Sequence, residues 1–85
     1  MLVQVEWVRE GEVMWSQGWV ERNGQTRSHI PGLDDHISFA NYDLQRKGYP
    51  SVEKTTDGSL VIDVTPLTDR GVLSEIIGYH GFVLR

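Results

Sequence analysis

The sequence predicts a small α+β domain, in which an antiparallel or mixed sheet in the order βββ-α-ββ-α-β packs one or two short helices against one face. Three observations predict this class. Apolar and polar residues alternate near the N-terminus, two dipeptides typical of hairpin turns separate later segments, and two segments carry apolar residues at helical spacing. No repeat or linker divides residues 1–85, so we expect a single domain.

Residues 2–9 and 13–22 alternate between apolar and polar side chains, which predicts the first two strands. A three-residue loop at Glu10-Gly11-Glu12 places Trp7 opposite Trp15. A two-residue loop at Glu10-Gly11 breaks this alignment, because a one-residue slip moves every side chain to the other face. We therefore expect a hairpin whose register depends on the loop length.

Three tryptophans stand at odd positions in this hairpin, and the three-residue loop also pairs Val3 with Trp19. A short chain with no cysteine must bury most of its large apolar side chains to be stable. We expect Trp7 and Trp15 to be interior. Trp19, which lies nearer the next turn, is the indole that we expect at an interface.

Asn23-Gly24 is the strongest turn signal in the chain, because a type I′ turn needs positive φ at both central residues. It predicts a third strand over residues 25–30, with Arg22 opposite Gln25. The three strands would form one meander, which Pro31-Gly32 ends.

A helix is expected to begin at Asp34 or Ser38, because either side chain can accept backbone N–H bonds at a helix start. It should run to about Lys47, with Gly48 as a left-handed stop. Apolar residues near one stripe support this prediction.

Residues 51–56 and 59–65 flank Asp57-Gly58 and predict a second hairpin. Alternate residues of its second strand form an inward apolar face: Leu60, Ile62 and Val64. Thr68 is then expected to cap a short helix that reaches about Ile77.

Gly78 is the expected stop of this second helix, and residues 79–84 then form the closing strand. That strand is apolar on both faces. If it lies at a sheet edge, it can pair with its own copy, which predicts a homodimer through the C-terminal strand.

Twelve acidic and eight basic residues give a net charge of −4, and the basic residues do not cluster. This balance makes nucleic-acid binding unlikely, because phosphates are repelled at long range. The absence of cysteine is compatible with a reducing cytoplasm, and no apolar run approaches membrane-spanning length. We expect a soluble cytoplasmic chain that begins at Met1 and contacts no membrane.

One cluster has the residue types of a metal site: His29, Asp34, Asp35 and His36 lie around the Pro31-Gly32 turn. The two carboxylates are equally well explained as acidic residues in the first turn of a helix. We therefore predict no metal and no cofactor, and the sequence leaves open whether these four residues converge.

Two other arrangements resemble catalytic sites. Ser28 and His29, with Asp34 or Asp35, supply the residue types of a hydrolytic triad, but neighbours in a strand point to opposite faces. His80 can act as a general base if a carboxylate such as that of Asp63 orients it. Neither pattern is specific, so we predict that the protein is not an enzyme.

Protein binding accounts for more of these observations, because acidic charge steers association with basic surfaces and aromatic residues supply binding energy. We expect an inhibitor or immunity-type module that covers a basic surface of a partner. The alternatives are single-stranded nucleic-acid binding through an aromatic sheet face and a small metal-dependent hydrolase. The candidate partner-binding residues are Glu10, Glu12, Trp19, Asp34, Asp35 and Asp43.

Overall fold

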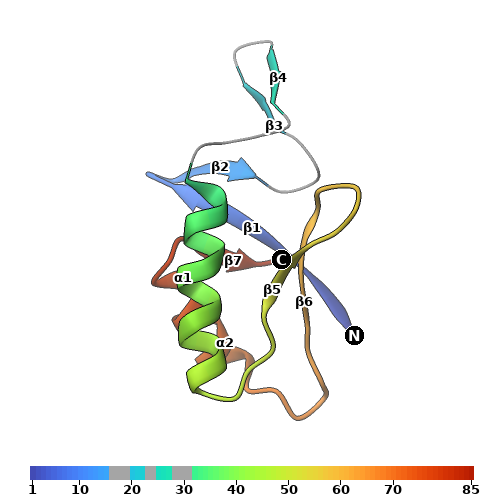
Figure 1. Ribbon diagram of the computed structural model, residues 1–85, viewed down its shortest axis with the longest axis vertical. Coiled ribbons are helices and arrows are strands. Elements are labelled where there is room, and N and C mark those ends of the chain that lie inside the picture. The colour runs from blue at the N-terminus through green and yellow to red at the C-terminus, as the bar shows by residue number, and fades with distance from the viewer. Residues whose placement is uncertain (16–19, 23–24, 28–31) are drawn as a thin grey trace.

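The structure, a computed structural model, describes residues 1–15, 20–22, 25–27 and 32–85. Within these ranges the chain forms a five-stranded antiparallel sheet, a separate two-stranded hairpin and two helices (Figure 1). The predicted α+β class is confirmed.

Strand β1 (Leu2–Arg9) is the centre of the larger sheet. One edge of β1 pairs with β2 (Glu12–Trp15) near its C-terminal end and with β6 (Leu60–Asp63) near its N-terminal end. The opposite edge pairs with β7 (Phe82–Leu84), and β5 (Val52–Lys54) pairs with the outer side of β6. All of these pairings are antiparallel, which is one of the two arrangements, antiparallel or mixed, that the sequence predicts.

The first hairpin has the predicted pairing of Trp7 with Trp15, but its loop is one residue shorter than the three-residue loop expected for this pairing. Its loop is the two-residue Glu10-Gly11, whose φ angles of 53° and 76° are both positive, as in a type I′ turn. Trp7 still pairs with Trp15, because a β-bulge follows the pairing of Val8 with Val13. The extra residue brings Trp15 back to the buried face and leaves Val13 41% exposed, although strict alternation would place these two residues on the same face.

The expected three-stranded meander is wrong. Val3 pairs with Ile62 of β6 rather than with Trp19, which lies outside the described residues. Strands β3 (Val20–Arg22) and β4 (Gln25–Arg27) form a hairpin of their own, set apart from the main sheet in Figure 1. Within this hairpin Arg22 lies opposite Gln25, as predicted.

Helix α1 (Leu33–Arg46) has Gly32 as its N-cap residue, so the predicted side-chain caps Asp34 and Ser38 lie inside the helix. Gly32 has a φ of 88°, a conformation that glycine adopts without strain. The other end of the helix agrees with the prediction, since Gly48 has a left-handed φ of 77°.

Helix α2 (Arg70–Gly78) is capped by Asp69, whose carboxylate accepts the Val72 N–H at 3.1 Å. The predicted cap, Thr68, instead accepts the backbone N–H of Thr65 at 3.0 Å. The helix ends at Gly78, but the left-handed residue that follows it is Gly81, with a φ of 88°.

A single apolar core lies between the sheet and the two helices. Both helices therefore cover the same face of the sheet. The inward face of β6 is fully buried, as predicted. The buried side chains are Val3, Val5, Trp7, Trp15, Leu33, Ala40, Leu44, Val52, Leu60, Ile62, Val64, Leu73, Ile77 and Phe82.

Candidate functional site

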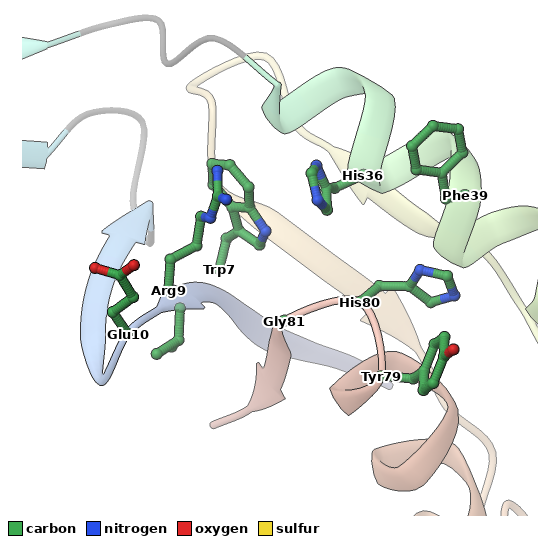
Figure 2. Close-up of a pocket in the computed structure, with 9 residues that line it drawn as sticks. Trp7, Arg9, Glu10, His36, Phe39, Tyr79, His80 and Gly81 are labelled. Carbon is green, nitrogen blue, oxygen red and sulfur yellow. The ribbon is translucent and has the colours of Figure 1, made fainter.

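A pocket of about 340 Å³ opens where the end of β1, the first half of α1 and the turn after α2 meet. Figure 2 shows Arg9 and Glu10 at one end of this pocket and Phe39, Tyr79 and His80 at the other. Trp7 and His36 lie between the two ends. We call it the ring pocket, because five of the side chains that line it carry rings: Trp7, His36, Phe39, Tyr79 and His80.

Helix α1 supplies one wall of the ring pocket. His36 and Phe39 lie three residues apart and therefore share a helix face, with their ring centroids 5.9 Å apart. The His36 Nδ1 lies 2.8 Å from the carbonyl oxygen of Gly32. A carbonyl can only accept, so Nδ1 donates, and this bond fixes the orientation of the imidazole.

Trp7 forms the floor of the ring pocket and is only 1% exposed. Its ring lies 5.1 Å from the His36 ring and 6.5 Å from the Phe82 ring. Among the described residues no group accepts a hydrogen bond from its buried indole N–H. A buried donor without an acceptor is costly, so packing in the core does not by itself account for this N–H.

Gly81 holds the turn after α2 against this indole. The Val8 N–H donates to the Gly81 carbonyl at 2.7 Å. A Cβ at Gly81 would lie 2.9 Å from the Val8 oxygen and 3.3 Å from the indole nitrogen. Only glycine fits here, because the position combines a positive φ with a close backbone approach.

His80 and Asp43 join the same turn to helix α1. The His80 Nε2 lies 2.6 Å from an Asp43 carboxylate oxygen, and the His80 side chain is only 13% exposed. Asp63, which the sequence suggests as one carboxylate that could orient His80, instead accepts from the N-terminal ammonium group of Met1 at 2.6 Å. The true partner lies 37 residues away in the sequence, and no local pattern indicates it.

A second cavity, of about 350 Å³, lies between the two helices. We call it the helix groove; Asp43 and Lys47 of α1, Val72 and Glu75 of α2, and Tyr79 contribute to it. Tyr79 therefore borders both cavities.

Three exposed aromatic side chains form what we call the aromatic rim: Phe39 lines the ring pocket, Tyr79 lines both cavities, and Tyr42 lies three residues after Phe39 on α1. Phe39 is 57% exposed, Tyr42 is 63% exposed and Tyr79 is 87% exposed. Phe39 and Tyr42 follow each other on one face of α1, and Arg46 of the same helix lies over the Tyr42 ring at 5.6 Å. Sequence reasoning missed the rim, because helical spacing alone does not distinguish an exposed aromatic from a core residue.

The described residues among the predicted partner-binding residues lie on separate elements. Glu10 and Glu12 flank the tip of the first hairpin, and Glu10 also lines the ring pocket. Asp34 and Asp35 lie in the first turn of α1, where Asp34 forms an exposed ion pair of 3.5 Å with Lys54.

Asp43, another predicted partner-binding residue, is bonded to His80, and Trp19 lies outside the described residues. Ser28 and His29, which the triad and metal hypotheses need, are also outside them. In the part of the chain that the structure describes, no three His, Asp or Glu side chains are placed to hold a metal ion.

Both described tryptophans are interior, as expected. Trp15 is 1% exposed, and its indole N–H donates to the Gly58 carbonyl at 2.7 Å. An aromatic platform for stacking nucleic-acid bases therefore cannot include Trp7 or Trp15.

Comparisons with protein-family models, with curated proteins and with solved structures found no match. The described helices include none that is both long and apolar enough to cross a bilayer. The class that fold and site define is an α+β domain with a ring-lined pocket beneath an exposed aromatic rim.

Proposed function

We propose that the protein is a non-enzymatic binding module whose aromatic rim contacts a basic surface of a partner protein, in the manner of an inhibitor or immunity-type protein. The observation that carries this proposal is the exposure of Phe39, Tyr42 and Tyr79, which range from 57% to 87% exposed. Aromatic side chains supply most of the energy at many protein interfaces. A small domain gains stability by burying such residues, so three that stay exposed, two of which line the cavities, favour a binding role.

Charge supports a basic partner. The net charge of −4 attracts positively charged proteins at long range and raises the association rate. Around the rim, Glu10, Asp43 and Glu75 place carboxylates in the two cavities. The lack of cysteine suits a reducing compartment, so we place this binding in the cytoplasm.

The chemistry of the ring pocket also favours binding over catalysis. Among the described residues that line it, none is serine, threonine or cysteine, the usual nucleophiles of covalent catalysis. The Asp43–His80 pair is accounted for structurally, since it ties the turn after α2 to α1.

The test is affinity purification from the native host, with the wild-type protein and the double variant Phe39→Ala, Tyr79→Ala as parallel baits. We expect a partner that the wild type retains and the variant loses. With the purified partner, we expect a one-to-one complex whose association rate falls steeply with added salt. A complex that forms equally well with the double variant would refute the role of the rim, and a salt-independent association rate would refute the basic partner.

Self-association is a second candidate, because β7 lies at an edge of the sheet. Among the described strands it pairs only with β1, and Val83 at its centre is 48% exposed. An edge strand of this kind can pair with its own copy across a two-fold axis. Sedimentation over a wide concentration range tests this, since a monomer at every concentration would contradict it.

A further inference from the structure

The ring pocket has a lining that attracts cations. The faces of aromatic rings carry partial negative charge, so several rings around one space favour a positively charged group. Trp7 and Phe39 both contact His36, with centroid distances of 5.1 and 5.9 Å, and form one continuous wall. Tyr79 stands at the opposite end of the wall from Arg9 and Glu10, with its ring 5.4 Å from the His80 ring (Figure 2).

The chain's own Arg9 already shows this attraction. Its guanidinium carbon lies 5.7 Å from the centre of the Trp7 ring, at one end of the pocket. The other end, between Phe39 and Tyr79, presents two rings that are more than half exposed. One end of the pocket is therefore occupied by a cation from within, while the rings at the other end face outward.

The carboxylates near the ring pocket complement a cation. Glu10 lines it, and Asp43 lies directly behind His80 at 2.6 Å. The lining itself carries one carboxylate, Glu10, and one guanidinium, Arg9, so the attraction for a further cation comes from the rings and from the net charge of −4.

From these contacts we infer that the ring pocket receives an arginine or lysine side chain of the partner, whose charged group contacts the exposed rings of Phe39 and Tyr79 at the end of the pocket away from Arg9. This inference rests on the proposed function and identifies the chemical group that the site recognises. The volume of about 340 Å³ accommodates one long basic side chain.

The direct test uses the isolated protein and small probes: arginine amide, tetramethylammonium and, as the anionic control, inorganic phosphate. Binding is followed by NMR signals of the Trp7 indole and of the Phe39 and Tyr79 rings. We expect both cations to shift these signals in a saturable way, with dissociation constants of about 1 to 10 mM. Tetramethylammonium has no hydrogen-bond donor, so its binding isolates the contribution of the rings.

Two charge variants of the pocket give opposite expected effects. Glu10→Gln should weaken arginine amide binding by roughly two- to five-fold, because it removes an attracting carboxylate. Arg9→Gln should strengthen it by a similar factor, because it removes a competing cation from the Trp7 ring. Glu53→Gln and Arg70→Gln are the matched controls, since both residues are exposed and neither lines the ring pocket or the helix groove. These controls should change the affinity little.

Shifts caused by phosphate but not by either cation would overturn the inference. So would affinities that Arg9→Gln and Glu10→Gln leave unchanged in variants whose NMR spectra show an intact fold. A partner complex that depends on Phe39 and Tyr79 but is insensitive to both charge variants would leave the proposed function in place and remove only the inference. Saturable cation binding by a protein that retains no partner would support the inference and count against the proposed function.

Discussion

Two sets of aromatic residues differ sharply in their surroundings, although they lie close together in the fold. Trp7, Trp15 and Phe82 are each 1% exposed and contribute to the core. The aromatic rim residues Phe39, Tyr42 and Tyr79 are between 57% and 87% exposed. The first set is explained by stability, because a domain of 85 residues has little apolar area to spare. The second set is not, which is why it supports a binding function.

The largest expected loss of stability is at a buried aromatic residue. Trp15→Ala should lower the free energy of unfolding by about 3 to 5 kcal/mol, because it empties a large core site and removes the bond to the Gly58 carbonyl. Urea unfolding measures this loss. Trp15→Phe is the control that keeps an aromatic ring, and it should lose less. A Trp15→Ala variant as stable as the wild type would mean that Trp15 does not belong to the core set.

The second largest effect is expected at Gly81, in the turn after α2 that packs against Trp7. Gly81→Ala should destabilise the fold, because the added methyl lies 2.9 Å from the Val8 oxygen. The matched control is Gly48→Ala, whose φ of 77° is similar but whose added methyl meets nothing within 4 Å. The control should cost about 1 to 2 kcal/mol for its left-handed backbone, and Gly81→Ala should cost at least about 1 kcal/mol more. Equal losses in thermal unfolding would contradict the close packing of Gly81 on Trp7.

Much of the buried set follows from the sequence. The alternation around Leu60, Ile62 and Val64 and the facing pair Trp7 and Trp15 are both present in the structure. The alternation of buried and exposed side chains breaks where an extra residue is inserted into a strand. The bulge in the first hairpin turns Val13 outward, and no residue pattern announces the bulge.

The ring pocket was largely beyond sequence reasoning, because its residues come from three separate segments. Trp7, His36 and His80 meet only through the tertiary fold. The sequence suggests Asp63 as a carboxylate that could orient His80, whereas the structure pairs His80 with Asp43. Of the predicted binding residues that the structure describes, Glu10 lines the ring pocket and Asp43 lies directly behind it.

The Asp43–His80 bond ties the turn after α2 to α1, and a double-mutant cycle measures the strength of this bond. We expect a coupling free energy of about 1 kcal/mol between Asp43→Ala and His80→Ala, the usual size for a partly exposed hydrogen bond. Chemical denaturation of the wild type, both single variants and the double variant provides the value. Strict additivity would show that the Asp43–His80 bond adds nothing to the attachment of this turn to α1.

A smaller, pH-dependent effect is expected at the turn beneath Trp15. The Thr55 hydroxyl and the Ser59 N–H donate to the Asp57 carboxylate and lower the pKa of Asp57 below its ordinary value. The folded state therefore favours the charged carboxylate. The resulting stability is present above the ordinary pKa of aspartate and is lost as the pH falls below about 4.

Asp57→Asn should reduce the loss of thermal stability between about pH 5 and pH 3. Thr55→Val keeps the carboxylate but removes its main donor, so it should reduce the same slope. A slope identical to that of the wild type in both variants would show that this turn contributes nothing to the acid sensitivity.

The smallest effect on stability is expected at the aromatic rim. Tyr79→Ala and Phe39→Ala should each change the free energy of unfolding by less than about 0.5 kcal/mol, because side chains this exposed contribute little to the core. The same variants should weaken arginine amide binding several-fold, because each removes one of the two rings that face the inferred cation. At these positions the variants should therefore lower the affinity for arginine amide while leaving the free energy of unfolding nearly unchanged. If Tyr79→Ala lost stability as Trp15→Ala does, the rim would be an extension of the core, and its exposure would no longer support a binding function.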